Sequence, residues 1–261
     1  MNYPDIVLTA VATALYFAGL VVVGFEIAFR KEGLGRVWQA IVACGLGVEA
    51  GALIARTAAS GEVPLTDLFE YNLVFTWAIV FVFFVLFRNR LPRLASLTLL
   101  VVVVFLLGTS FLYYTDPKGV SMPALRSYWL YIHVSLAALG ETFFAIGFVS
   151  SIIYLVKSAK PDDVLDHLTY RAISLGFPLF TAGALVAGAI WAKKAWGAYW
   201  SWDPKEVLSL VVWLVYAAYL HARLVRGLRG KVLAVISIAG FLLTIFTIFG
   251  TLIFGGLHSY S

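Results

Sequence analysis

Charged side chains are scarce in this 261-residue sequence: Asp, Glu, Lys and Arg make up 13% of it, whereas 62% of the residues are apolar. Soluble domains contain about 45–50% apolar residues, and so few charges cannot cover the surface of a soluble domain of this length. The mean hydropathy of +0.93 agrees. We therefore exclude a soluble enzyme and predict an all-α integral membrane protein. The net charge is +5, and the basic residues lie between apolar runs. This placement indicates that they set the orientation of the helices in the membrane, and it excludes nucleic acid as a partner.

Cysteine is also nearly absent, because Cys44 is the single one. The chain therefore contains no intrachain disulfide, no CxxC redox pair and no CxxCH motif for covalent haem attachment of its own. The N-terminus lacks the basic region and the small-residue cleavage site of a removable signal peptide. We expect the first apolar run to be retained as a helix.

Long apolar runs are what the sequence has instead. A helix needs about 20 apolar residues to cross the hydrocarbon core. The sequence predicts about eight transmembrane helices, at residues 5–29, 37–58, 71–87, 94–114, 128–156, 172–192, 206–224 and 232–255. No internal repeat is evident, so a single polytopic membrane domain over 1–261 is the simplest division.

The connections between these runs differ in charge. Most of the 19 Lys and Arg residues lie in the connections at one end of the predicted helices. The positive-inside rule predicts that this end faces the cytoplasm and that both termini lie on the outer, periplasmic face. The outer connections carry Pro, Gly, Asp and aromatic residues, so we expect a loop-borne functional site on that face.

The densest aromatic cluster is a predicted outer loop at residues 191–206. An interfacial aromatic belt is one explanation for it. A contiguous loop that contains glycine also offers flat apolar faces on which a planar ligand can stack. The candidate ligand-binding residues of this loop are Trp191, Trp196, Gly197, Tyr199, Trp200 and Trp202.

The end of this loop has the pattern of a helix start. Asp203, Pro204 and Glu206 fit the N-cap, N1 and N3 positions, so capping is an alternative to a catalytic role for the two carboxylates. Asp67 and Glu70 have the same spacing before the third run. Lys205 has no capping role, which makes it a candidate partner for an anionic group of a ligand.

Two of the four histidines are predicted to meet at the outer face. His133 lies near the outer start of the fifth run, and His258 follows the eighth. A lone histidine is more often structural, but two that converge on a flat aromatic platform are suited to ligate a haem iron from both sides. Glu141, eight residues after His133, is a candidate for the wall of the same cavity, but a paired or protonated structural role is favoured for a carboxylate inside a predicted helix.

The other two histidines differ from this pair. His221 is 18 residues past Asp203, which places it roughly 27 Å deeper along a helix. An ionisable residue inside the membrane is a functional candidate, so His221 suggests a second, inner ligand position; contact with lipid headgroups is the alternative. His167 lies among aspartates in a predicted inner loop, where we expect it to be solvated.

The stretch WGAYWSWDPKEVLSLVVWLVYAAYLHARL resembles the tryptophan-rich WWD signature of haem-handling proteins in cytochrome c maturation, of the CcsA or ResC type of the System II pathway. The stretches SYWLYIH, GLHSY and VPLTDLFEYNLVF resemble the same family. This resemblance implies a subunit of a holocytochrome c synthase, or haem lyase, that receives or exports haem b. His133 and His258 are implied iron ligands above the tryptophan loop.

The resemblance also implies partners. Haem held at the outer face is implied to be joined through thioethers to the CxxCH segment of an apocytochrome c. His221 matches the family's intramembrane histidine, an iron ligand whose mate comes from a CcsB- or ResB-type membrane partner. We hypothesise in addition that Lys193, Lys194 or Lys205 pairs with the haem propionates.

Two other functions compete with this interpretation. A haem chaperone or exporter of the CcmC type, which only displays haem for another protein, is the main alternative; eight predicted helices and His221 favour the synthase. A haem-free transporter with an aromatic gate is the second. We expect the chain in a bacterial plasma membrane, with the thylakoid membrane as the alternative.

Overall fold

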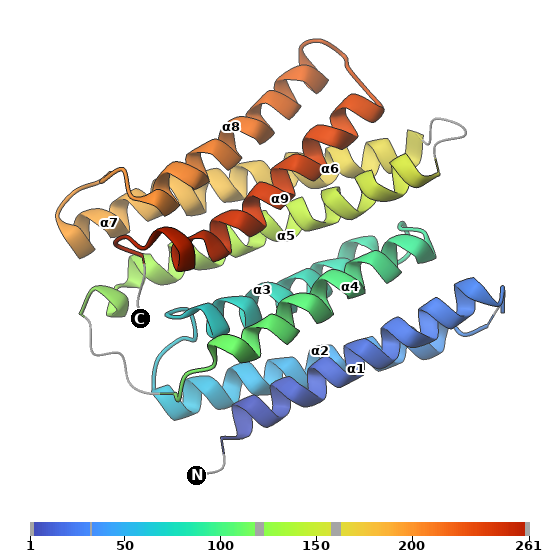
Figure 1. Cartoon of the computed structure of the whole chain (residues 1–261), viewed down its shortest axis with the longest axis horizontal. Coiled ribbons are helices and arrows are strands. Elements are labelled where there is room, and N and C mark those ends of the chain that lie inside the picture. The colour runs from blue at the N-terminus through green and yellow to red at the C-terminus, as the bar shows by residue number, and fades with distance from the viewer. Residues whose placement is uncertain (1–2, 32, 118–122, 158–162, 259–261) are drawn as a thin grey trace. The chain divides into compact units, whose positions relative to one another are not determined.

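The computed structural model of this chain describes residues 3–31, 33–117, 123–157 and 163–258, and all regular elements within these ranges are helical. Eight helical segments in the described ranges are long and apolar enough to cross a membrane. The predicted all-α fold with about eight membrane-spanning helices is therefore confirmed, whereas the orientation of the termini stays a prediction. The chain divides into two compact units, Met1–Ser121 and Met122–Ser261 (Figure 1). A single domain over 1–261 also stays a prediction.

The described residues of the first unit form four long helices. They are α1 (Pro4–Ala28), α2 (Gly35–Ser60), α3 (Leu68–Val82) with its π-helical continuation η1 (Phe83–Phe87), and α4 (Arg93–Ser110) with the 3₁₀ turn η2 (Phe111–Tyr113). Helices α1 and α2 pack closely because a Cβ on Gly45 would lie 2.7 Å from Cε1 of Tyr16. Small residues at such crossings let helices approach in a membrane, where lipid competes for apolar contacts.

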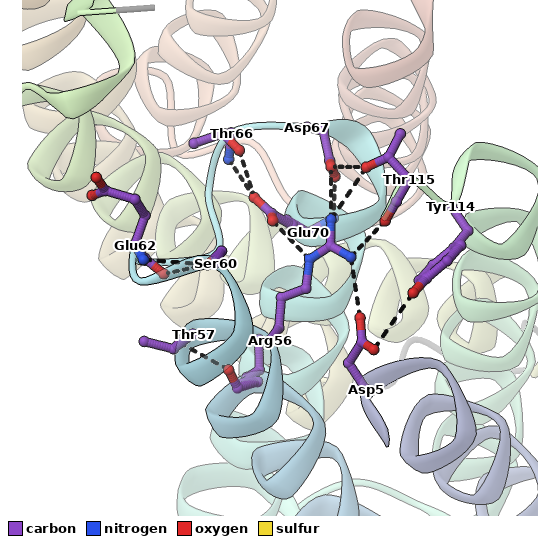
Figure 2. A network of polar contacts seen from close by, with 11 residues as sticks. Asp5, Arg56, Thr57, Ser60, Glu62, Thr66, Asp67, Glu70, Tyr114 and Thr115 are labelled. Carbon is purple, nitrogen blue, oxygen red and sulfur yellow. Dashed lines mark hydrogen bonds and ion pairs between the residues drawn. The ribbon is translucent and has the colours of Figure 1, made fainter. Parts of the chain in front are cut away.

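A buried arginine ties the elements of the first unit together at one end (Figure 2). Arg56 of α2 is 2% exposed and forms ion pairs with Asp5 at 3.1 Å, Asp67 at 3.1 Å and Glu70 at 2.8 Å. Its two terminal nitrogens also donate to the backbone oxygen and Oγ1 of Thr115, at 2.6 and 3.2 Å. All five N–H groups of the guanidinium are thus used, which is what a buried charge requires.

The predicted cap before the third run is half formed. Asp67 is the N-cap of α3, and its side chain accepts a hydrogen bond from the Glu70 backbone N–H at 2.8 Å. The Glu70 carboxylate does not reach back to Asp67; it accepts from the backbone N–H and Oγ1 of Thr66, both at 2.8 Å, and from Arg56. The ion-pair cluster therefore replaces the second half of the capping box.

The second unit is built around one long helix, α5 (Tyr128–Val156), which follows the short η3 (Pro123–Arg126). It packs against α6 (Asp163–Phe180), the π-helix η4 (Thr181–Ala187), α7 (Gly188–Trp196) and α9 (Lys231–Phe254), while α8 (Pro204–Leu224) packs on α9. Glycines allow the close crossing of α5 with α6, since a Cβ on Gly140 would lie 2.7 Å from the Phe180 backbone nitrogen.

The sixth predicted helix, 172–192, is too short. The membrane-length segment runs through α6, η4 and α7 from Val164 to Trp196. The helix continues through its charged first turns because Asp166 is buried in an ion pair with Arg223 at 2.7 Å, a pairing that a hydropathy scan cannot detect. His167 is consequently an exposed residue of α6 and not part of a loop.

The predicted tryptophan loop at 191–206 is correspondingly too long. Helix α7 continues to Trp196 and α8 begins at Pro204, so the loop consists of residues 197–203. Lys193 and Lys194 lie in the last turn of α7, where positive charge interacts favourably with the helix dipole. Gly197 ends the helix in the left-handed conformation, with a φ of 83°.

Candidate functional site

A small cavity in the second unit is lined by residues of α5, η4, the first turns of α7, the loop 197–203, the start of α8 and the chain after α9. Figure 1 shows how these elements are arranged. Its volume is about 40 Å³. His133 and His258 both line it, as do Tyr199 and Trp200 of the loop. The remaining wall consists of one leucine and of small or polar residues, namely Leu185 and Ala184, Gly188, Ala189, Ala192, Lys205, Glu206 and Ser209.

Asp203 connects the start of α8 to the chain after α9. It forms the predicted capping box with Glu206, so the helix-cap prediction is confirmed. The same carboxylate accepts a hydrogen bond from Nδ1 of His258 at 2.7 Å and one from the Leu257 backbone N–H at 2.6 Å. Capping and contact with a candidate ligand are therefore combined in one side chain, which the spacing in the sequence did not predict.

The electrostatics of this pair favour a charged aspartate and a neutral histidine. Burial opposes ionisation of Asp203, but the hydrogen bonds from His258 and Leu257 outweigh it, so the pKa of Asp203 lies below its ordinary value. Burial lowers the pKa of His258 more than the Asp203 hydrogen bond raises it. At neutral pH the imidazole is therefore neutral, the form that binds a metal ion.

Gly256 makes this contact sterically possible. Its φ of 111° is a conformation that residues with a side chain rarely adopt. A Cβ at this position would also collide with Oδ1 of Asp203. Only glycine lets the chain after α9 turn back and bring Leu257 and His258 onto the start of α8.

His133 is oriented by the π-helix. Its Nδ1 lies 2.9 Å from the carbonyl oxygen of Gly183 in η4. The ring packs against Gly188, where a Cβ would lie 3.0 Å from both Nδ1 and Cε1 of the imidazole. The wider turn of a π-helix, often found at functional sites, and a glycine one turn later therefore together form the surface on which His133 lies.

Both imidazoles are left with one nitrogen for a ligand. A carbonyl oxygen and a carboxylate can only accept hydrogen bonds, so Nδ1 carries the proton in His133 and in His258. Nε2 of each ring then has an unshared electron pair, and neither Nε2 has a hydrogen-bond partner within the described ranges of the chain. The convergence of the two histidines that topology predicts is thus present, with the tautomer that metal ligation needs.

The aromatic residues fall into three groups that the sequence did not separate. Trp191 is 1% exposed and contacts both histidines, with ring centroids 5.8 Å from His133 and 5.7 Å from His258. Trp196 packs edge-on against His258 at 4.8 Å. These two tryptophans support the histidine rings, whereas Tyr199 and Trp200 line the cavity and Trp202 is 74% exposed.

Of the three candidate lysines, Lys205 alone is among the residues that line the cavity in the described part of the chain. It interacts electrostatically with Glu141 and Asp203. Lys193 and Lys194 are exposed, and Lys193 donates to the Gly197 carbonyl at 2.7 Å. Glu141 is buried, and it is not among the residues of the described cavity wall.

His221 lies in the last turn of α8, at the opposite end of the helix from Asp203. Its side chain is exposed and belongs to an apolar stripe along one face of the helix, formed with Val211, Leu214, Ala218 and Val225. Because α8 runs unbroken from Pro204 to Leu224, His221 lies roughly 27 Å along the helix from Asp203.

Comparison with known proteins identifies relatives over most of the chain. Residues 65–258 match the cytochrome C assembly protein family. A cytochrome c biogenesis protein CcsA from Chlamydomonas reinhardtii is 38% identical over 226 residues, which cover 80% of this chain and 64% of that protein. CcsA from Prochlorococcus marinus (strain NATL1A) is 36% identical over 253 residues, which cover 80% and 79%.

A solved structure, the cytochrome c haem lyase CcmF, has a similar fold, with a TM-score of 0.76 at 19% identity over 95% of this chain and 47% of that one. The chain thus spans about two thirds of the algal relative and about half of CcmF. The family match begins just before α3 and ends at His258, so it includes the whole cavity. The chain belongs to the cytochrome C assembly protein family, and within that family to the CcsA-type cytochrome c biogenesis proteins.

Proposed function

We propose that this chain is the haem-handling membrane subunit of a holocytochrome c synthase. It receives haem b as substrate, holds the iron between Nε2 of His133 and Nε2 of His258, and presents the haem at the outer face to the CxxCH segment of an apocytochrome c. The observation that supports this most is the pair of imidazoles at one cavity, each with Nδ1 bonded to a protein acceptor and Nε2 without a protein partner in the described chain.

The surroundings of the histidines fit a planar, anionic substrate. In this proposal the porphyrin lies across the mouth of the cavity, with one edge exposed. Tyr199 and Trp200 offer aromatic faces for stacking. Lys205 is the lysine at the cavity and is therefore our candidate partner for a propionate, in preference to Lys193 and Lys194.

The chemistry asks for positioning more than for a strong acid or base. Thioether formation adds the S–H of a cysteine across a haem vinyl group, so the protein has to hold the two reactants together. Two imidazole ligands fix the ring plane and influence the potential of the iron. The exposed edge leaves the vinyl groups accessible to the thiols of the apocytochrome.

A membrane partner completes the inner position in this proposal. His221 lies in the exposed stripe of α8, and His133 and His258 are already assigned to the haem at the outer face. A transmembrane helix of a CcsB- or ResB-type subunit, carrying one histidine, supplies the second ligand for haem in transit. We place the assembly in a bacterial plasma membrane; relatives from Chlamydomonas and Prochlorococcus keep the thylakoid membrane as the alternative.

Co-expression with the partner and a reporter apocytochrome c tests this proposal. We expect covalent haem on the reporter with the wild type, and its loss in His133→Ala and in His258→Ala. His167→Ala is the matched control, because His167 is an exposed histidine of the same unit. Variants that bind haem and transfer it without thioether formation would instead favour the chaperone function.

Haem affinity should fall in Lys205→Ala and not in Lys194→Ala; equal affinities would remove the role of Lys205.

A further inference from the structure

Both histidines at the cavity donate a hydrogen bond from Nδ1, but the acceptors of the two bonds differ in charge. Nδ1 of His133 donates to a peptide carbonyl, that of Gly183, at 2.9 Å. Nδ1 of His258 donates to a carboxylate, that of Asp203, at 2.7 Å. Hydrogen bonds to a charged acceptor are shorter and about twice as strong as those between neutral groups. A carboxylate behind an imidazole also raises its basicity as a metal ligand.

The acceptor of His258 is the more firmly held of the two. The Asp203 side chain is 2% exposed and takes two backbone N–H bonds besides the one from His258, from Leu257 at 2.6 Å and from Lys205 at 3.1 Å. Because it is buried, water screens its charge little. Asp203 therefore fixes both the position and the donor strength of His258.

The acceptor of His133 is neutral and already in use. The Gly183 carbonyl also accepts the backbone N–H of Gly188 at the end of η4. If the His133 ring turns away from the iron and its bond to Gly183 breaks, no buried charge loses a hydrogen-bond donor. The same movement of His258 would take a donor from the buried Asp203 carboxylate. His133 can change its bond to iron at a lower cost than His258 can.

We propose that His258 and His133 are unequal ligands: His258, bonded to Asp203, stays on the iron, while His133 gives up its place to the imidazole of the incoming apocytochrome. Asp203 acts as the positioning residue for the retained ligand. This inference rests on the proposed function. The exchange breaks one iron–nitrogen bond and forms another, with no change in the oxidation state of the iron, and His133 is released as a neutral imidazole.

Carbon monoxide identifies the weaker ligand without any need for the apocytochrome. It displaces one histidine from ferrous haem, and photolysis then leaves the iron with the retained histidine alone. The iron–histidine stretching vibration, measured by resonance Raman spectroscopy, reports which histidine remains. His133→Ala and His258→Ala, reconstituted with ferrous haem under carbon monoxide, which takes the vacant axial position, give the reference spectra for His258 and His133.

The expected result is that the wild type matches His133→Ala. Asp203→Asn should lower the stretching frequency in the wild type and in His133→Ala, but not in His258→Ala. Asparagine is as good an N-cap as aspartate, so the start of α8 is kept. Glu206→Gln is the matched control, since it removes a carboxylate from the same cap and the same cavity wall but no hydrogen bond of His258. The charge of Glu206 acts on His258 only through space, so the frequency should fall less than in Asp203→Asn.

The outcomes separate this inference from the proposed function. A wild-type spectrum that matches His258→Ala would overturn the inference and leave haem ligation intact. An unchanged frequency in Asp203→Asn would overturn the role of Asp203. If Asp203→Asn binds no haem, the two reference variants still decide which histidine is retained. A wild-type protein without a bis-histidine haem spectrum would contradict the proposed function itself.

Discussion

The two units use buried polar groups in opposite ways. In the first unit, Arg56 spends all five N–H groups on protein oxygens, and its three carboxylate partners come from α1 and the start of α3 (Figure 2). In the second unit, His133 and His258 each use Nδ1 for a hydrogen bond within the protein, and Nε2 of each ring is left for a ligand. A network in which every polar group is hydrogen-bonded stabilises a fold. An imidazole with one ring nitrogen hydrogen-bonded and the other available is suited to bind a metal ion. The difference separates a structural cluster from a candidate site.

Breaking the cluster of the first unit should have the largest effect on stability. Arg56→Met leaves Asp5, Asp67 and Glu70 without their cation, and removing one partner of a buried ion pair costs about 3–5 kcal/mol. We expect a large drop in the thermal midpoint in detergent. The haem spectrum of the folded fraction should keep its band positions. Arg90→Met, at an exposed arginine, is the control; equal midpoints for both variants would refute the structural role.

Gly256→Ala should damage the site and spare the first unit. The added methyl group collides with Asp203 and forces an unfavourable φ. Loss of a supporting hydrogen bond typically reduces metal affinity by about 10–100-fold, and we expect a haem affinity reduced within that range in a titration of apoprotein. Gly255→Ala is the matched control: its φ of 65° is also positive, but a Cβ there meets nothing within 4 Å. The same loss in both variants would mean that backbone strain, and not the His258–Asp203 contact, is responsible.

Gly188→Ala should have a smaller effect on the other histidine. A Cβ 3.0 Å from Nδ1 and Cε1 of His133 pushes the ring by a few tenths of an ångström. Overpacking of this kind costs about 1 kcal/mol at its lower end, which is about fivefold in haem affinity. Gly108→Ala in α4, where a Cβ meets nothing within 4 Å, should leave the affinity unchanged. A Gly188→Ala variant with wild-type affinity would show that the ring of His133 is not confined at this surface.

The smallest effect concerns the pH dependence of the first unit. Burial, followed by the charge of Glu70, raises the pKa of Asp67 above its ordinary value of 3.8. A raised pKa in the folded state means that protonation favours the fold, so this contribution is present in full below pH 3.8 and is lost as the pH rises through the folded pKa. Asp67→Asn, uncharged at every pH, should flatten this part of the stability profile, measured by denaturant titration at several pH values. An identical profile in the variant would contradict the assignment.

The sequence predicted which histidines meet at the candidate site, but not the hydrogen bonds that hold them there. Hydropathy predicted the helices. The topology predicted that His133 and His258 meet at one end, because His133 lies near the start of one predicted span and His258 follows the end of another. The Asp203 cap was readable from local spacing. The bond from His258 to Asp203 was not, because it joins residues 55 positions apart and depends on the turn at Gly256.

Other features were hidden for similar reasons. Arg56 looked like one more basic residue at the end of a span, since its partners lie on three other segments. The Gly183 acceptor of His133 depends on the register of a π-helix, which hydropathy does not encode. The early start of α6 depends on the pairing of Asp166 with Arg223. Long-range polar contacts are what a reading of local patterns misses.

The most direct test of haem ligation by His133 and His258 is the absorption spectrum of the purified protein. The spectrum is recorded for the wild type, His133→Ala, His258→Ala and His167→Ala, each with and without imidazole. We expect a bis-histidine haem spectrum in the wild type and in His167→Ala. The haem band should be lost in the other two variants and should return when imidazole is added. A haem-free wild type, or His133→Ala and His258→Ala spectra indistinguishable from that of His167→Ala, would contradict this ligation.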